Sequence, residues 1–555
     1  MRPPSMLALA CCAASYYRPA LRAVQQPSSR LPRLAASASS VAVPPRRGLV
    51  RMQGGSRASA AVTQSQQQLQ DADGDVKASS PPSAMDLKPP RGTRDFYPED
   101  MALRSWLFGS WRRVAAQHGF EEYDAPVLET EDLYIRKAGE DVTQQLYSLE
   151  DRSGRRLSLR PEMTPSLARM VLAKRNALPL PLKWFSIPQC WRYERMTRGR
   201  RREHYQWNLD VWGVTTLHAE VELLSAAVTF MSSVGLTASD VGIKISTRRV
   251  LSELLPTLGV PEDKFASTCV LVDKLDKLPE EEVRKELLAA GLDDAAATTL
   301  LSTLSLSSLE QLEAVVGAES EAVQELKTLW ALAEAYGLSE WLVLDLSVVR
   351  GLAYYTGVVF EGFDRTGELR AIFGGGRYDK LLGTFGGDDL AAVGFGFGDA
   401  VIVELLKMKN LLPEQPGKSA KSLLVGCPDE ALRPTAMRAA AALRAGGATV
   451  DLVLESKKPK WVFKHADRTG AGYVALFDAR EADKGLVRVK RLSDGVQQDV
   501  EIAELSAWFA AETADGAAPA PGAGDAIDDA KRAAEAARTA AATARKAAAK
   551  LKGDA

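Results

Sequence analysis

The 555-residue sequence predicts an α+β protein, in which an antiparallel sheet with flanking helices is followed by a smaller α/β domain. Segments with the alternating pattern of strands recur in the first part, and some are joined by connections that contain no helix pattern, which is typical of antiparallel sheets. These segments are Lys183–Tyr193, Arg202–Trp212, Leu342–Val349 and Tyr354–Phe363. Between 421 and 512 the strand and helix patterns alternate, which indicates a parallel or mixed sheet.

The N-terminal part differs in composition from the rest of the chain. Residues 1–70 contain nine Arg and no Lys, Asp or Glu. An arginine-rich, serine-rich stretch without acids is typical of an organellar transit peptide. We therefore expect 1–85 to be a transit peptide and disordered leader that directs the protein to the chloroplast, the mitochondrion or both; a plain disordered tail is the alternative.

The body is expected to begin with a first domain at 86–405. A helix at 99–118 places Leu103, Trp106, Leu107 and Trp111 on one face. Within this domain, 240–335 is rich in Leu, Ala, Glu and Ser at helical spacing, which predicts a mainly helical insertion. A linker at 406–420 and the α/β domain at 421–512 follow.

The C-terminal residues 513–555 are expected to form an Ala-rich linker and helical tail, because alanine has the highest helix propensity. We expect this tail to be solvated; a weak electrostatic contact with RNA is the alternative.

Bulk composition excludes several classes of protein. No run of about 18 apolar residues is present, so no membrane span is expected. The five cysteines include no CxxC pair and only four histidines accompany them, which argues against a zinc site and against a disulfide framework. Lys and Arg (70) nearly balance Asp and Glu (71), so a surface that binds nucleic acid has to be a local patch.

The segment Trp191–Trp212 carries the strongest chemical signal. Arg192 and Glu194 share one face of its first strand, because side chains alternate. One face of the returning strand is apolar, and the other holds Arg202, His204, Gln206, Asn208 and Asp210. Burial of such a polar row is costly without ligands or partners, and arginine forks suit phosphate. We therefore predict a platform for a polyphosphate and a polar small molecule; a solvated face with cross-strand ion pairs is the alternative.

This hairpin, WRYER followed by GRRREHYQ, resembles motif 2 of class II aminoacyl-tRNA synthetases in its histidyl form. Further segments resemble the same family in order: KPPRGTRDFYPED (88–100), GFEEYDAPVLE (119–129, motif 1), RPEMTPSLAR (160–169), RGLAYYTG (350–357) and GGGRYDKLL (374–382). The resemblance implies the class II antiparallel sheet, a C-terminal α/β anticodon-binding domain and a homodimer. It also implies a histidine–tRNA ligase whose substrates are ATP with Mg²⁺, L-histidine and tRNA(His), without zinc.

The resemblance also implies roles for individual residues. Arg350 and Arg192 are the expected catalytic residues, which hold the α-phosphate and the histidine carboxylate. ATP is expected to contact these two and Glu194, Arg200, Arg202 and His204. Histidine is expected to contact Glu162, Met163, Thr164, Gln206, Asp210, Tyr354 and Tyr355. Arg195 and Arg198 are expected to reach the acceptor end of the tRNA.

Three positions depart from the family pattern. Many class II enzymes have an arginine on ATP in motif 3, where this chain has Val401, so a triphosphate contact is lost or is replaced by Arg377 or Arg202. His204 stands where a phenylalanine stacks on adenine, which we expect to make that face pH-sensitive. Ala353 replaces an aspartate of some members, without a predicted effect.

Three alternatives remain. A catalytically altered paralogue could sense histidine or tRNA, although such regulators usually lack the anticodon-binding domain. An enzyme of the same class for proline, threonine or glycine is argued against by RGLAYYTG. A purely RNA-binding protein would require an inactive site.

Overall fold

The computed structural model describes residues 86–135, 143–261, 264–272, 275, 278–349, 354–414, 416 and 422–514. The predicted transit peptide, Arg350, Ala353 and, apart from Thr513 and Ala514, the predicted C-terminal tail lie outside the described residues. Thr513 and Ala514 belong to the last helix of the preceding domain, so the expected start of the tail at 513 is wrong.

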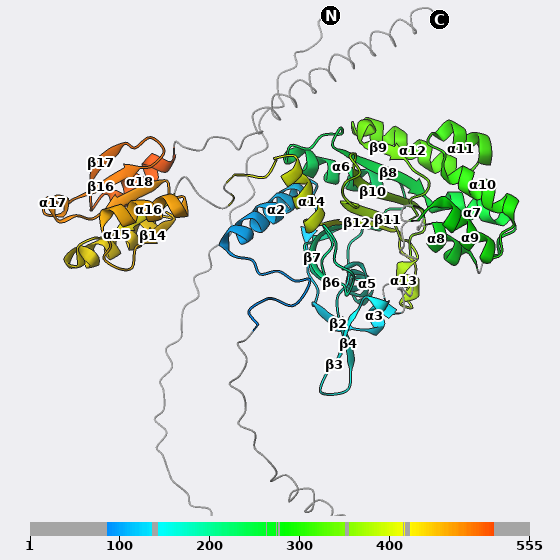
Figure 1. The fold of residues 1–555 in the computed structure, drawn as a ribbon, viewed down its shortest axis with the longest axis horizontal. Helices are drawn as coiled ribbons and strands as arrows, with labels where there is room; N and C mark the ends of the chain where they lie inside the picture. The colour runs from blue at the N-terminus through cyan, green and yellow to red at the C-terminus, as the bar shows by residue number, and fades with distance from the viewer. Residues whose placement is uncertain are drawn as a thin grey trace, which may run out of the picture. The chain divides into compact units, whose positions relative to one another are not determined.

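The first part of the chain is built on a nine-stranded sheet with the order β1-β5-β7-β12-β11-β10-β8-β9, with β6 also paired to β7 (Figure 1). The strands are β1 (Glu121–Glu122), β5 (Leu182–Ser186), β6 (Gln189–Trp191), β7 (Glu203–Trp212), β8 (Val241–Thr247), β9 (Leu342–Leu344), β10 (Val358–Asp364), β11 (Phe373–Arg377) and β12 (Ala392–Gly398). The pairs between β5 and β8 are antiparallel, and the outermost pairs, β1 with β5 and β8 with β9, are parallel. The predicted antiparallel sheet is confirmed.

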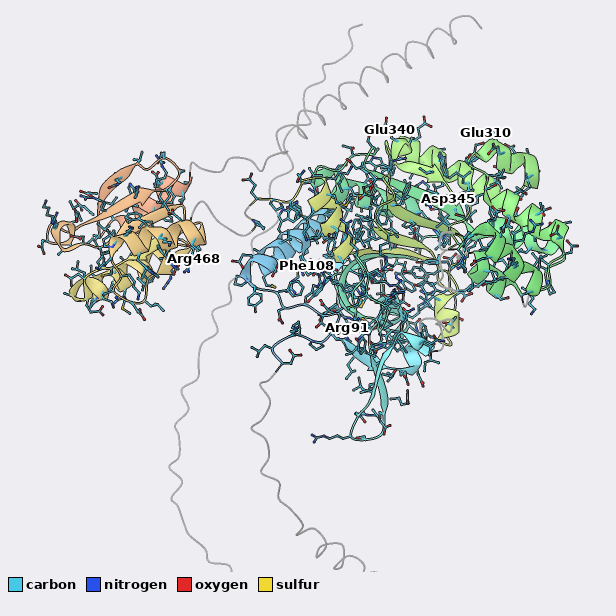
Figure 2. The ribbon with its side chains drawn as sticks, in the orientation of Figure 1. Arg91, Phe108, Glu310, Glu340, Asp345 and Arg468 are labelled. Atoms are coloured by element: carbon cyan, nitrogen blue, oxygen red, sulfur yellow. The ribbon has the colours of Figure 1, made fainter. Side chains whose placement is uncertain are left out.

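One face of this sheet forms the core with helices α2 (Pro98–Gln117), α6 (His218–Ser233) and α14 (Asp399–Met408). Trp111 of α2 stacks on Trp207 of β7, with ring centroids 6.0 Å apart, and Phe108 stacks on Trp111 in turn. Figure 2 labels Phe108 on this helix. The predicted helix at 99–118 is thus confirmed. Because the apolar side chains of β7 turn toward these helices, its alternate polar side chains face the other side.

The segment after β8 is helical, with α7 (Arg248–Thr257), α8 (Phe265–Val272), α9 (Glu280–Ala289), α10 (Asp294–Leu304), α11 (Leu309–Val316), α12 (Glu321–Ala335) and the 3₁₀ turn η2 (Ser339–Trp341). The expectation that helical structure begins at 240 is wrong for its first residues, because 241–247 form strand β8. This strand pairs along its whole length with β10, and six of its seven residues are buried. Helix α7 begins only after Thr247, whose hydroxyl accepts a hydrogen bond from the amide of Arg249.

Smaller elements surround the polar face of the sheet. A second sheet has the order β2-β4-β3, formed by β2 (Leu128–Thr130), β3 (Tyr147–Glu150) and β4 (Arg156–Leu159). The short helices are α3 (Asp132–Ile135), α5 (Thr164–Ala173) and α13 (Leu381–Thr384). Helix α5 packs on α3 and α13, so its first turn lies next to the polar face.

The C-terminal part has a separate core and a five-stranded mixed sheet with the order β14-β13-β15-β16-β17. Its strands are β13 (Leu423–Gly426), β14 (Val450–Leu452), β15 (Tyr473–Leu476), β16 (Leu486–Arg491) and β17 (Gln497–Glu501), with helices η3 (Glu430–Leu432), α15 (Arg433–Ala445), α16 (Pro459–Thr469), α17 (Ala479–Ala482) and α18 (Leu505–Ala514). Strands β14, β13 and β15 are parallel, whereas β16 and β17 are antiparallel. Across the described ranges, no helix is long and apolar enough to cross a membrane.

Candidate active site

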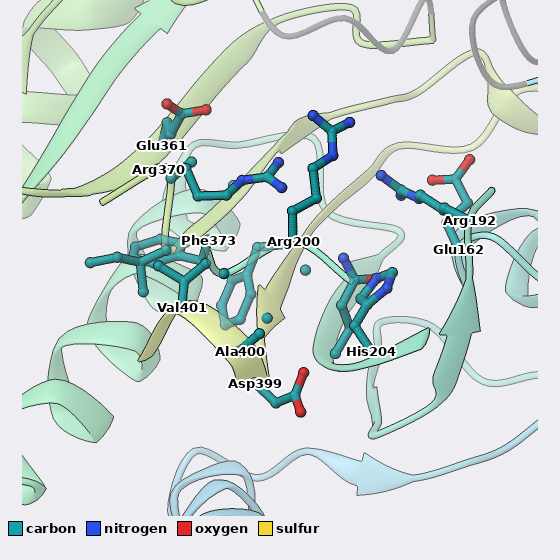
Figure 3. Close-up of a pocket in the computed structure, with 18 of the residues that line it drawn as sticks. Glu162, Arg192, Arg200, His204, Glu361, Arg370, Phe373, Asp399, Ala400 and Val401 are labelled. Carbon is teal, nitrogen blue, oxygen red and sulfur yellow. The ribbon is translucent and has the colours of Figure 1, made fainter. Parts of the chain in front are cut away.

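A cavity of about 970 Å³ lies over the polar face of β7, β12, β11 and β10 (Figure 3). The sequence-predicted residues that line it come from four separate segments of the chain. They are Glu162, Thr164, Arg192, Glu194, Arg200, His204, Gln206, Tyr354 and Tyr355. The structure therefore brings together most of the predicted site residues that it describes.

The glycines of β12 leave this face open. In the antiparallel register Gln206, Asn208 and Asp210 of β7 stand opposite Gly398, Gly396 and Gly394. A Cβ at 394 would lie 2.1 Å from Oδ1 of Asp210, and a Cβ at 396 would lie 3.2 Å from Nε2 of Gln206. The polar side chains of β7 thus occupy the space that side chains on β12 would need.

Cations gather at one end of the cavity. Nε of Arg192 donates to the carbonyl of Pro161 at 3.0 Å, and Arg200 forms an ion pair with Glu194. Burial is the main cause that lowers the pKa of Arg200, and Arg370 and Arg192 lower it further. The guanidinium groups are close enough to repel one another, so they produce a positive potential that attracts an anion.

His204 lies on β7 within the same region. Burial, followed by the positive charges of Arg192, Arg94 and Arg370, lowers the pKa of His204 to about 3. The imidazole is therefore neutral at physiological pH. The expectation that its stacking face is pH-sensitive is wrong near neutrality, because a cationic imidazole here would be both desolvated and repelled.

An ion-pair network fixes the position of β7 beside the first turn of α14. Nη2 of Arg94 lies 3.1 Å from Oε1 of Glu203 and 3.0 Å from Oδ2 of Asp399. The amide of Tyr205 donates to Oδ1 of Asp399 at 3.0 Å. The N-terminal segment that contains Arg94 therefore holds the start of β7 against the start of α14.

Next to Arg192, the cavity lining combines the carboxylate of Glu162 with tyrosines (Figure 3). The Tyr354 hydroxyl donates to Oε2 of Glu162 at 3.2 Å, and its ring lies against Tyr355, with centroids 4.9 Å apart. Burial and the charge of Glu162 raise the pKa of Tyr354 well above its usual value, so its hydroxyl stays a donor. Thr164 begins α5 beside Glu162.

Asp210 and Met163 are not among the residues that line the cavity. Asp210 is 3% exposed and accepts a hydrogen bond from the Tyr378 hydroxyl. Tyr378, which does line the cavity, also packs edge-on against Tyr354 at 5.7 Å. Met163 is fully buried, with its sulfur 3.7 Å from NH1 of Arg160.

The other predicted residues lie outside the cavity lining or outside the described residues. Arg202 packs its guanidinium over the Tyr193 ring at 3.9 Å and does not line the cavity. Arg195 and Arg198 are exposed, and Arg198 lies 3.8 Å from Glu404. Arg350 is not among the described residues, so its predicted role rests on the sequence.

Comparison with known families decides the relationship. The family model for histidyl-tRNA synthetase matches residues 92–399, and the model for the anticodon binding domain matches 417–512. This chain belongs to the histidyl-tRNA synthetase family.

Relatives of the family cover most of the chain. The chain is 57% identical to the "Histidine--tRNA ligase, chloroplastic/mitochondrial" of Arabidopsis thaliana over 76% of its length and 86% of that protein. It is 40% identical to the "Histidine--tRNA ligase" of Opitutus terrae over 75% of its length and 96% of that protein. The crystal structure of histidyl-tRNA synthetase from Nostoc sp. PCC 7120 matches with a TM-score of 0.64 at 25% identity, over 77% of this chain and all of that one.

One structural neighbour bears on the regulatory alternative. A Bacillus halodurans protein described as an "ATP phosphoribosyltransferase regulatory subunit/histidyl-tRNA synthetase" matches with a TM-score of 0.57, over 69% of this chain and 97% of that one. At 24% identity, this match shows a shared fold and nothing more. The match of 417–512 to the anticodon binding domain does not favour the regulatory alternative.

Within this member of the synthetase family, Arg377 does not replace the missing motif 3 arginine. Its Nη2 lies 2.7 Å from Oε2 of Glu220 and its Nη1 lies 3.2 Å from Oδ1 of Asp379. Only 5% of Arg377 is exposed. That expectation is wrong, because Arg377 joins β11 to α6 in the interior. Arg370, seven residues earlier, lines the cavity instead, together with Arg192 and Arg200.

The sequence analysis missed several lining residues. Tyr378 lies in the quoted segment GGGRYDKLL, so the resemblance offered a signal for it, whereas Arg370 and Glu361 lie in no quoted motif. Across the described residues, no group of three or more His, Cys, Asp or Glu side chains is arranged to hold a metal ion.

Proposed function

We propose that this chain is a histidine–tRNA ligase, which activates L-histidine with ATP to histidyl-adenylate and transfers it to tRNA(His), with release of AMP and diphosphate. One observation carries the proposal: a single cavity joins an arginine-lined end to an end built of Glu162, Thr164 and tyrosines. Membership in the synthetase family gives this pairing a reaction, because a polyphosphate and an amino acid have to meet there.

In the first step, a carboxylate oxygen of histidine forms a bond to the α-phosphorus of ATP, and the bond from that phosphorus to the β-bridging oxygen breaks. Negative charge develops on the phosphoryl oxygens. We infer that Arg192 and Arg350 stabilise it, because fixed cations in a partly dry site stabilise such transition states strongly. In the second step, a ribose hydroxyl at the end of the tRNA attacks the acyl carbon, and AMP leaves.

ATP enters this reaction as its magnesium complex, as a substrate. Glu194 and Glu361 are carboxylates that line the cavity among the arginines, so oxygen ligands that suit Mg²⁺ are available. Glu194 and Arg200 contact each other in the structure. We propose that Glu194 accepts a hydrogen bond from the adenine amino group and that Arg200 contacts the β- and γ-phosphates, and both contacts require this ion pair to separate.

For histidine, we propose that Glu162, Thr164 and Gln206 face the ammonium group, while Asp210, Tyr354 and Tyr355 bracket the ring. A site built to hydrogen-bond the imidazole rejects analogues that leave its polar groups unpaired, by on the order of 10⁴–10⁵-fold. The proposed role of Asp210 depends on Tyr378, because Tyr378 lines the cavity and donates a hydrogen bond to Asp210, whereas Asp210 does not line the cavity.

For the tRNA, we propose contacts at two places. Arg195 and Arg198 are exposed in the hairpin loop, where they can reach the acceptor end. In the C-terminal part, α16 carries Lys460, Lys464 and the partly exposed Trp461, which stacks on His465 at 4.8 Å. Lysines beside an exposed aromatic suit RNA, so we expect the affinity for tRNA(His) to fall steeply with salt.

Assembly and location are proposals of the same kind. We propose a homodimer, which light scattering of the purified protein tests. We also propose import into the chloroplast, the mitochondrion or both, supported by the absence of acidic residues in 1–70 and by the name of the Arabidopsis relative. A fluorescent fusion of residues 1–85 that stays in the cytosol would contradict import.

The deciding experiment is ATP–pyrophosphate exchange, measured with each amino acid in turn and followed by charging of tRNA(His). We expect exchange with histidine only. Exchange with proline, threonine or glycine would favour another class II enzyme. Histidine binding without exchange would favour a sensor, and tRNA binding alone would favour an RNA-binding protein.

A further inference from the structure

The wall of the cavity at Val401 has no cation of its own, and the nearby lining residue Asp399 is paired with Arg94. Val401 lies in the first turn of α14, is 5% exposed and lines the cavity with its neighbour Ala400. A Cβ at Gly199 would lie 3.2 Å from Cγ2 of Val401 and 4.0 Å from Cδ of Arg370. The stem of Arg370, which comes from the connection between β10 and β11, therefore reaches the same point of the hairpin loop as the Val401 side chain.

Arg370 extends from this point toward the other cations. Figure 3 shows its guanidinium group beside Arg200, with Glu361 of β10 nearby. The charge of Arg370 lowers the pKa of both Arg200 and His204, so it acts on the region where ATP is proposed to bind. A cluster of like charges at one end of a cavity is unfavourable by itself and becomes favourable when a polyanion enters.

We propose that Arg370 binds the β- and γ-phosphates of ATP and replaces, from a different segment of the chain, the cation that Val401 cannot supply. This inference rests on the proposed function. Arg377 is held by Glu220 in the interior, and Arg202 packs on Tyr193 outside the cavity lining, so neither can make this contact without rearrangement. Among the described arginines, Arg192, Arg200, Arg201 and Arg370 line the cavity, and of these Arg370 is the one whose stem reaches the same point of the hairpin loop as Val401.

The test compares the variant Arg370→Ala with Glu368→Ala, which alters an exposed side chain of the same connection outside the cavity lining. A bidentate charge-assisted contact with phosphate corresponds to roughly a 10- to 100-fold loss in affinity on the usual scale. We expect Arg370→Ala to raise the KM for ATP by that factor in pyrophosphate exchange, and Glu368→Ala to leave it unchanged. The KM for histidine should stay the same in both variants.

Binding of AMP separates the phosphates from the nucleoside. Because AMP lacks the β- and γ-phosphates, Arg370→Ala should weaken ATP binding and leave AMP binding unchanged in equilibrium titrations. Equal weakening of both nucleotides would overturn the assignment to the β- and γ-phosphates. Unchanged ATP binding would overturn the whole inference and leave Arg370 as a surface residue of the β10–β11 connection.

A second variant tests whether the two positions serve the same contact. In the double variant Arg370→Ala/Val401→Arg, a guanidinium would enter the cavity from α14. Recovery of ATP affinity would support the replacement, and a folded double variant without recovery would overturn it. If the unaltered protein shows no histidine-dependent exchange, the proposed function fails. If the unaltered protein is active and Arg370→Ala has the same KM for ATP, only this inference fails.

Discussion

Replacement of Asp210 by alanine tests how the cavity distinguishes histidine. The Asp210 carboxylate is 3% exposed and accepts a hydrogen bond from the Tyr378 hydroxyl, so it acts where solvent cannot compensate for its loss. A hydrogen bond to a charged group contributes about 1.5–3 kcal/mol. That range corresponds to roughly a 10- to 100-fold increase in the KM for histidine.

The effect should be confined to one substrate. Asp210 lies six residues along β7 from His204, and a strand rises about 3.4 Å per residue, so about 20 Å separate it from the proposed adenine site. We therefore expect the KM for ATP to stay nearly constant when both substrates are varied in pyrophosphate exchange. Asp210→Asn is the matched control, because it keeps the shape and an oxygen for Tyr378 while it removes the charge.

The comparison of the two variants identifies the cause. If the charge of Asp210 orients the imidazole, both Asp210→Asn and Asp210→Ala should raise the KM for histidine. If Asp210 acts only by holding Tyr378, the KM should rise chiefly in Asp210→Ala, because Asp210→Asn keeps an oxygen for the Tyr378 hydroxyl. Equal increases in the KM for ATP and histidine would refute the reasoning, because they would indicate a general disturbance of the sheet. Thermal unfolding of both variants detects such a disturbance.

Three further predictions concern single positions. Arg350→His should lower the rate of adenylate formation at least ~100-fold in pyrophosphate exchange, on the usual scale of electrostatic stabilisers; a near-normal rate would contradict its role. Gly394→Ala places a Cβ 2.1 Å from Oδ1 of Asp210 and should destabilise the protein by about 1–3 kcal/mol in denaturant titrations, whereas Gly109→Ala on α2 meets nothing within 4 Å and should not destabilise it. Because the pKa of His204 is lowered from 6.5 to about 3 on folding, its contribution to stability is present above pH 6.5 and is lost as the pH falls toward 3. As the pH is lowered from about 6.5 to 4, the unfolding free energy of His204→Phe should therefore fall less than that of the unaltered protein. An equal dependence of the unfolding free energy on pH in both proteins would contradict this prediction.

The parts of the site that lie on one strand could be predicted from the sequence. Alternation places His204, Gln206 and Asn208 of β7 on one face and Trp207 and Leu209 on the other, and in the structure the first three line the cavity while the other two lie in the core. This inference works because the period of a strand is fixed by backbone geometry and needs no knowledge of neighbours.

The contacts between distant segments could not be predicted in this way. Arg370 and Arg377 are seven residues apart, yet one lines the cavity and the other is buried against Glu220. Their difference depends on where α6 packs and on the order of β10, β11 and β12, which alternation does not specify. The same is true of Tyr378, whose contact with Asp210 joins positions 168 residues apart.

The register between β7 and β12 explains why this face can hold an extended ligand. The polar residues Gln206, Asn208 and Asp210 stand opposite three glycines at alternate positions of β12. On that strand the ligand side has no side chains, while Phe395 and Phe397 of the same strand are buried in the core on the other side. The alternating glycines at 394, 396 and 398 therefore belong to a strand of the sheet. The glycines are needed because Gln206, Asn208 and Asp210 of the neighbouring strand occupy the space beside them. The proposed nucleotide near His204 and the proposed amino acid near Asp210 can therefore lie along one continuous surface of backbone.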